Sequence, residues 1–404
     1  MQYKSKIIND PVHGFIRIPY GILYDIIQHP YFQRLRRISQ TGLLSLIFPG
    51  ATHTRFHHAI GAMHLMNQAL DTLKLKGTYL FQNEEESAML AILLHDVGHG
   101  PFSHALESLL MEDWHHEKLS LLMMNQLNEA FSGQLSTAIE MFQGKYHRQF
   151  FNQLISSQLD VDRMDYLKRD SFFTGVSEGN INASRIISMM NTSDDELVIE
   201  RKGIHSIENY LMARMQMYWQ VYYHKTAALA EFILVKILSR AKKLISEGTP
   251  LEAPENLKYF LYKNNFQTAT QEDIVRFMEL DDTDVLQAIK LWQKTDDLVL
   301  SYYCKAIIQR KLPKVITAAE AFSEKMIDEK ITAVNRLFGI DYGAEFVHQI
   351  SHKIIPYDTE KQPIYLLGNN GEKLRLEEST NQILAQSLKT PATKFILTFP
   401  KEIY

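Results

Sequence analysis

The chain has 404 residues, of which 45% are hydrophobic and 22% are charged, as in an ordinary folded globular protein. The net charge of −4 argues against a general nucleic-acid coat, although nucleic-acid binding is not excluded. No apolar run is long enough to span a bilayer, and the single cysteine, Cys304, excludes an intrachain disulfide framework. We therefore expect a cytoplasmic protein that has no membrane segment.

The first 250 residues predict a mainly helical core behind a small β-hairpin. Apolar and polar residues alternate over residues 4–19, which predicts the hairpin, and Pro30 divides the helical pattern of residues 21–45 into two helices. A strand is predicted at residues 196–201. Hydrophobic periodicity predicts the remaining helices at about 53–73, 84–94, 113–127, 135–158 (two short helices), 159–170, 180–191 and 204–247.

The rest of the chain changes character twice. Residues 255–310 are predicted to be helical, with a helix cap at Asp281, whereas residues 314–404 alternate strand-like pieces with helices at about 317–337 and 377–388. Prolines at 250, 254 and 313 separate these stretches. The expected units are a helical core at residues 1–250, a helical extension at 251–312 and a small α+β lobe at 313–404.

Three histidines and an aspartate fall within the eleven residues from Leu94 to His104. Glycines and a proline break the preceding helix there, so His95 and Asp96 stand at its end, where both side chains can reach one external point. A neutral imidazole and a carboxylate at such a point form a mixed nitrogen and oxygen metal site. A buried histidine bonded to one aspartate is the alternative, but the additional histidines favour the metal site.

Matching residues occur on other predicted helices. Arg55 and His58 lie three residues apart and share a helix face. Two further helices carry stripes that could be either site walls or ordinary solvent-facing and core surfaces: Asp162, Arg163, Tyr166 and Asp170 on one, and Arg214, Tyr218 and Tyr222 on the other. A divalent Mn, Fe, Co, Ni, Zn or Mg ion would suit the two imidazoles and two carboxylates of His58, His95, Asp96 and Asp162.

The side chains expected around this metal are mostly arginines and histidines: Arg55, His99, His104, Glu107, His116, Arg163 and Arg214. This combination suits phosphate ester hydrolysis, because the cations stabilise transition-state charge and a histidine protonates the leaving oxygen. His95 and His99 also have the spacing of the zinc-protease motif H-E-x-x-H, but Gly98 interrupts the continuous helix that this motif needs. The chain has no GxxxxGKS loop, which excludes a P-loop NTPase.

The order of His58, His95-Asp96 and Asp162 resembles the H…HD…D signature of HD-domain metal-dependent phosphohydrolases. The resemblance is closer to the deoxynucleoside triphosphate triphosphohydrolases, a branch that includes the animal enzyme joining a sterile-alpha-motif to an HD domain, and its bacterial relatives. The matching strings span about residues 7–225: Ile8–Gly14, Phe32–Arg36, Phe48–Ala51, Arg55–His58, His95–His104, His116–Glu117 and Asp160–Tyr166. No motif covers the C-terminal lobe.

The resemblance implies a role for each matching residue. The metal ligands would be His58, His95, Asp96 and Asp162. The candidate catalytic residues are His99, His104 with Glu107, and His116. Phosphates would be bound by Arg55, Arg163 and Arg214. The sugar would be contacted by Gln40 and Asp170 at its 3′-hydroxyl, by Tyr166 at its side, and by Tyr222, which would crowd the 2′ position. Tyr218 stands where the animal enzyme has a histidine near the phosphates.

The implied reaction is metal-dependent hydrolysis of a deoxynucleoside triphosphate (dNTP) to deoxynucleoside and inorganic triphosphate, by a homodimer or homotetramer. Gln28 stands where the animal enzyme has an aspartate that reads an activating guanine, so a nucleotide activator stays open. An HD-type nucleotide phosphodiesterase or phosphatase is one alternative, and a non-catalytic nucleotide-sensing HD protein is another. The complete ligand set with His104 and His116 favours an enzyme, because a sensor needs no acid for a leaving group.

Overall fold

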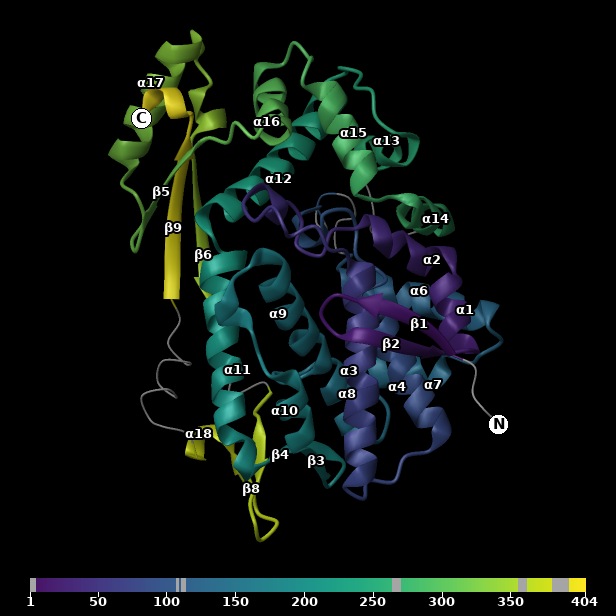
Figure 1. Cartoon of the computed structure of the whole chain (residues 1–404). Coiled ribbons are helices and arrows are strands. Elements are labelled where there is room, and N and C mark those ends of the chain that lie inside the picture. Colours follow the sequence, from purple (N-terminus) through teal and green to yellow (C-terminus); the bar gives the residue numbers. More distant parts are fainter. Residues whose placement is uncertain (1–4, 107–108, 110–113, 264–269, 355–361, 380–391) are drawn as a thin grey trace.

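The computed structural model describes residues 5–106, 109, 114–263, 270–354, 362–379 and 392–404. It is mainly helical, with a small N-terminal hairpin and small sheets near the C-terminus, which confirms the predicted fold class (Figure 1). The hairpin pairs β1 (Ser5–Asp10) with β2 (Gly14–Pro19), and Gly14 takes the positive φ of 74° that this tight turn requires. No helix in the described part of the chain is long and apolar enough to cross a membrane.

The helical core is built around α3 (Arg55–Leu75), which packs against α4 (Gln82–Leu94) and α9 (Val161–Thr174). Gly61 allows α9 to approach α3, because a Cβ atom at this position would lie 2.1 Å from the carboxylate of Asp165. As predicted, a break at Pro30 separates the first two helices. The surrounding helices are α1 (Ile22–Gln28), α2 (Pro30–Gln33), α6 (His116–Ala130), α7 (Ser136–Phe142), α8 (Gln149–Ile155) and α10 (Ala183–Met189).

The prediction of one continuous helix over residues 204–247 is wrong. The structure divides this stretch into α11 (Ile204–Met217), a π-helical turn (Tyr218–Tyr222) and α12 (Lys225–Ser246). His224 leaves the helical conformation, and its Nδ1 accepts a hydrogen bond from the backbone N–H of Thr226, which caps α12. Hydrophobic periodicity could not reveal this break, because the residues of the π turn still pack one side against the core.

The helical extension packs on α12 through a second hydrophobic core. Asp281 caps α15 through its side chain, as the sequence predicts. The helices of this extension are α13 (Glu255–Tyr262), α14 (Gln271–Glu279), α15 (Asp282–Trp292) and α16 (Leu298–Ile308). In Figure 1, α14 and α15 lie close to the N-terminal segment that holds α2.

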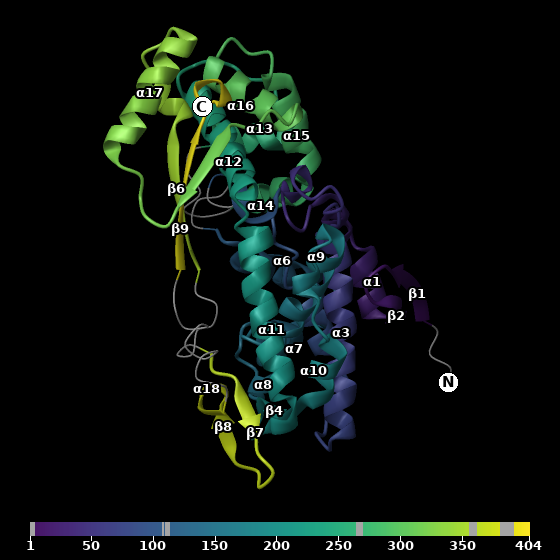
Figure 2. The same cartoon turned by 60° about the vertical axis from the view of Figure 1, so that its left-hand side comes forward.

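The C-terminal part contributes to two separate sheets. In one, β9 (Ala392–Phe399) pairs antiparallel with β5 (Lys314–Ala318) and β6 (His348–Ile354), beside α17 (Glu324–Phe338). In the other, β7 (Tyr365–Leu367) and β8 (Lys373–Arg375) extend the core hairpin of β3 (Met190–Ser193) and β4 (Glu196–Glu200). Figure 2 shows β7, β8 and α18 (Leu376–Ser379) beside β4, at the opposite end from α17.

Two predicted helices of this region need comment. The helix expected from residue 317 begins instead at Glu324, because residues 314–318 form β5 at the edge of the three-stranded sheet. Most of the helix expected at 377–388 falls outside the described residues. The division of the chain into three units stays a prediction, and the pairing of β7 with β4 means that residues of the last unit contact the first one.

Candidate metal centre and substrate cavity

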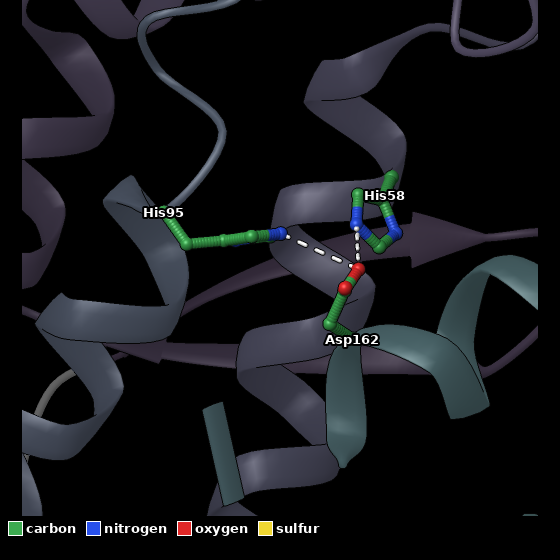
Figure 3. A group of neighbouring side chains, drawn as sticks. All are labelled: His58, His95 and Asp162. Atoms are coloured by element: carbon green, nitrogen blue, oxygen red, sulfur yellow. Dashed lines mark ion pairs between the residues drawn. The ribbon is translucent and has the colours of Figure 1, made fainter. Parts of the chain in front are cut away.

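Side chains from three helices converge on one point. His58 comes from α3, His95 follows the last residue of α4, and Asp162 lies in the first turn of α9. Their potential ligand atoms all lie within 4.8 Å of one another. The Nε2 atoms of His58 and His95 lie 3.0 and 3.4 Å from the same oxygen, Oδ1 of Asp162. Figure 3 shows both imidazoles pointing toward this carboxylate.

Asp96, the fourth predicted ligand, stands next to this group. Its Oδ1 lies 3.3 Å from Nε2 of His95, and its Oδ2 lies 3.7 Å from Nε2 of His58 and pairs with Arg55. Burial would raise the pKa of Asp96, but Arg55 and then His95 hold it well below its usual value. The carboxylate is therefore ionised, and the structure brings all four predicted ligands together.

The donor atoms fit a divalent metal. The Nε2 atoms of His58 and His95 are buried, and within the described residues neither makes a hydrogen bond of good geometry. Burial alone would lower the pKa of His58, but the adjacent carboxylates of Asp162 and Asp165 raise it to about 10. The site therefore attracts positive charge strongly. Two imidazole nitrogens and neighbouring carboxylate oxygens are a donor set that suits a divalent first-row transition metal.

The buried carboxylate of Asp165 fixes the ring of His58 through its Nδ1 atom. The sequence analysis gave Asp165 no role. Its Oδ2 lies 2.8 Å from Nδ1 of His58, and its Oδ1 lies 2.6 Å from Nε2 of His13 in the hairpin turn. Arg169 donates to both oxygens at 2.9 Å, and also to Asp10 at 2.8 Å. Because an ionised carboxylate only accepts, Nδ1 of His58 carries the hydrogen, which leaves Nε2 free for the metal.

A cavity of about 530 Å³ adjoins the metal centre. The cavity is lined by residues from the loop before α3, from α3, from the loop after α4, from α9, from the π turn and from α12. Its lining includes these predicted site residues: Gln40, Arg55, Asp96, His99, Asp162, Tyr166, Asp170, Tyr218 and Tyr222. The sequence analysis missed Ser103, whose Oγ accepts a hydrogen bond from Nε of Arg55 at 2.9 Å. Hence one cavity contains metal-site carboxylates and most of the predicted substrate contacts.

Two predicted phosphate-binding arginines are engaged elsewhere and are not among the residues described as lining the cavity. Arg163 forms an ion pair with Asp160, the N-cap of α9. Arg214 donates to the side chain of Gln158 at 2.8 Å, and its guanidinium lies 5.8 Å from the ring centre of Tyr218. Because Tyr218 lines the cavity, Arg214 is separated from the cavity by one side chain.

A second polar group in the cavity is built on Asp170. The hydroxyl of Tyr222 donates to Oδ2 of Asp170 at 2.6 Å, and Nε2 of His53 lies 2.6 Å from Oδ1. Burial, followed by the charge of Asp170, raises the pKa of Tyr222 well above its usual value, so this hydroxyl remains a donor. Gln40 joins the group because its backbone N–H donates to the carbonyl of His53 at 3.1 Å. In the sequence, only the closeness of His53 to Arg55 could have indicated that it belongs to this site.

Of the candidate catalytic histidines, His99 lies beside Asp96. Nδ1 of His99 is 3.3 Å from Oδ1 of Asp96. The ring of His99 stacks on the ring of His116, the first residue of α6, with 4.0 Å between ring centres. The side chain of His104 and the whole of Glu107 lie outside the described residues, so the roles predicted for these two residues stay predictions.

Known proteins resemble the chain over all or part of its length. A model of the HD domain matches residues 55–170, and a model of the HD associated region matches residues 181–258. The crystal structure of a phosphohydrolase from Bacteroides thetaiotaomicron VPI-5482 is 44% identical, with a TM-score of 0.95 over 98% of this chain and 100% of that one.

Two curated proteins extend the comparison. An uncharacterized protein of Bacillus subtilis is 34% identical over 99% of this chain and 93% of its own length. The Dictyostelium discoideum homolog of the deoxynucleoside triphosphate triphosphohydrolase SAMHD1 is also 34% identical, over 62% of this chain and 52% of its own length. The similarity to that homolog therefore leaves about half of its length unmatched.

Proposed function

Because the chain belongs to the family of HD-domain phosphohydrolases, we propose that it hydrolyses dNTPs to deoxynucleoside and inorganic triphosphate. The observation that carries this proposal is the cavity, which holds the Asp170–Tyr222 pair together with the carboxylates of Asp96 and Asp162. One end of a nucleotide can therefore contact a polar sugar-binding group while its phosphates contact the metal centre. The similarity to the Dictyostelium homolog of SAMHD1 supports the same substrate class.

The spacing along α9 supports a nucleotide bound lengthwise. Asp162 and Asp170 are eight residues apart on one helix, which corresponds to about 12 Å along its axis. In the proposed pose the α-phosphate lies near Asp162, while Asp170 and Gln40 accept and donate hydrogen bonds at the 3′-hydroxyl. The ring of Tyr222, held by Asp170, then occupies the space that a 2′-hydroxyl would need, which favours deoxyribose.

The proposed reaction is attack of water on the α-phosphorus, with cleavage of the bond to the 5′-oxygen. A divalent metal bound by His58, His95, Asp96 and Asp162 would polarise the phosphoryl oxygen and acidify the attacking water. Arg55, fixed between Asp96 and Ser103, would stabilise the charge that develops on the α-phosphate. We assign proton transfer to the 5′-oxygen to His104 with Glu107, supported by His99 and His116.

The β- and γ-phosphates would be bound by Arg163 and Arg214 in this proposal. The carboxylate of Asp160 raises the pKa of Arg163, so this guanidinium remains charged. Burial would lower the pKa of Arg214, but neighbouring tyrosines, Tyr166 first, raise it, so Arg214 remains charged as well. Binding would require Arg163 to share its charge between Asp160 and the nucleotide. We also propose a homodimer or homotetramer, which light scattering would contradict by finding a monomer both with and without nucleotide.

Product analysis tests the proposal. The protein would be incubated with Mn²⁺ and a panel of dNTPs and ribonucleotides, and the products separated by chromatography. Intact triphosphate with free deoxynucleoside is the expected result. Pyrophosphate with a monophosphate, or stepwise release of phosphate, would instead indicate the phosphodiesterase or phosphatase alternative. Nucleotide binding without turnover would indicate a sensor.

A further inference from the structure

The first turn of α15, in the helical extension, contacts two segments that line the cavity. Oδ1 of Asp282 accepts the backbone N–H of Phe102 at 2.7 Å, and Oδ2 accepts the backbone N–H of Ser39 at 2.8 Å. Only 7% of Asp282 is exposed, so water does not replace these bonds easily. One carboxylate therefore joins the chain before Gln40 to the loop that follows Asp96.

The loop held by Asp282 has an unfavourable backbone conformation. Phe102 and Ser103 have φ angles of 55° and 58°, a region that residues other than glycine adopt rarely. Two such residues in succession persist only where surrounding contacts determine their conformation. Besides Asp282, the extension supplies Phe277 of α14, whose ring would lie 3.1 Å from a Cβ atom at Gly100. The extension thus supports this loop at two points.

The conformation of this loop determines the contacts of Arg55. Oγ of Ser103 accepts a hydrogen bond from Nε of Arg55 and donates to the carbonyl of Ser39, both at 2.9 Å. The same guanidinium pairs with Asp96 through Nη1. If the loop relaxed from its left-handed conformation, Ser103 would move and Arg55 would lose one of its two fixed contacts.

We propose that Asp282 is a positioning residue, which fixes Ser39 and Phe102 and thereby aims Arg55 at the reacting phosphate. The proposal rests on the hydrolytic function proposed above, and it assigns α15 to the catalytic unit rather than to a separate accessory part. Asp282 acts through the backbone and through Ser103. In this pose it touches neither the substrate nor the metal ligands.

The neighbouring aspartate offers a matched control. Asp281 caps α15 by accepting the N–H of Thr283 at 2.9 Å, and it pairs with Arg37. Within the described residues its side chain makes no bond to a residue that lines the cavity. Replacing either aspartate by asparagine removes one negative charge from the same helix end, but only Asp282→Asn disturbs the two cavity segments.

The test compares Asp282→Asn and Asp281→Asn in the full chain. Asparagine keeps the shape of Asp282, but it has one accepting oxygen and turns an amide N–H group toward the second backbone donor. We expect kcat of Asp282→Asn to fall by about 10- to 100-fold, with little change in KM and in metal content. Hydrogen exchange should become faster in the peptides that contain Ser39 and Phe102. Asp281→Asn should keep the wild-type kcat, and hydrogen exchange in both peptides should stay as slow as in the wild-type protein.

Two results would overturn the proposal: wild-type kcat in Asp282→Asn, or an equal loss of kcat in both variants, which would indicate general weakening of α15. If Asp282→Asn does not fold, Asp282→Ser is judged by the same criteria. If the wild-type protein hydrolyses no dNTP, the proposed substrate is wrong. In that case the exchange measurement, and turnover of whichever phosphate ester the protein does hydrolyse, still decide the role of Asp282.

Discussion

Replacing Asp165 by asparagine tests whether the buried residues behind His58 control metal binding. Asp165 is fully buried and interacts with His58, His13 and Arg169. An asparagine has one oxygen for these partners and places an amide N–H group against at least one donor. The hydrogen on Nδ1 of His58 then loses its acceptor, and the imidazole can rotate or change tautomer.

Two effects of different size should follow. Loss of a carboxylate that orients a metal-bound histidine typically weakens metal affinity about 10- to 100-fold, or about 1.4–2.7 kcal/mol. In addition, among the described residues Arg169 would retain Asp10 as its one carboxylate partner, and breaking a buried ion pair typically costs about 3–5 kcal/mol of stability. Calorimetric titration with Mn²⁺ measures the loss of metal affinity. Urea unfolding of the metal-free protein measures the loss of stability.

Asp10→Asn is the control, because Asp10 contacts Arg169 but not His58. It should lower the free energy of unfolding while leaving Mn²⁺ affinity near the wild-type value. The reasoning fails if Asp165→Asn binds Mn²⁺ as tightly as the wild-type protein. It also fails if both variants lose affinity equally, since the loss would then follow from destabilisation alone.

Other measurements address the packing, the protonation and the specificity of the molecule. Gly61→Ala would place a methyl group 2.1 Å from the Asp165 carboxylate, so unfolding free energy should fall by at least about 1–3 kcal/mol in urea titrations; an unchanged value would contradict the close packing of α3 and α9. Burial, and then Lys236, lower the pKa of His348 to about 4. Only the unfolded chain therefore gains this proton between about pH 6.5 and pH 4, so stability should fall with decreasing pH by up to about 3 kcal/mol, and His348→Gln should reduce that fall. Tyr222→Ala should raise kcat/KM for ribonucleotides relative to dNTPs, whereas Tyr222→Phe, which keeps the ring, should not.

Several local features of this protein follow from its sequence. Gly98, Gly100 and Pro101 end the helix at Leu94, so His95 and Asp96 had to stand at a helix terminus, and Asp281 carried the signature of a cap. The strict period of α9 aligned Asp162, Tyr166 and Asp170, which all line the cavity. Each of these predictions depends on residues within a few turns of one another, where backbone geometry alone sets the outcome.

Contacts between distant parts of the chain were decided only by the tertiary structure. No local pattern reveals that His13 and His58 meet at Asp165, or that Asp282 bonds to Phe102, because each pair lies far apart in sequence. The stripe that suggested a phosphate-binding role for Arg163 could not show its pairing with Asp160, since a helical period gives the face of a residue but not its partner. Buried charges must find partners wherever the fold supplies them, so their final contacts depend on the whole packing of the chain.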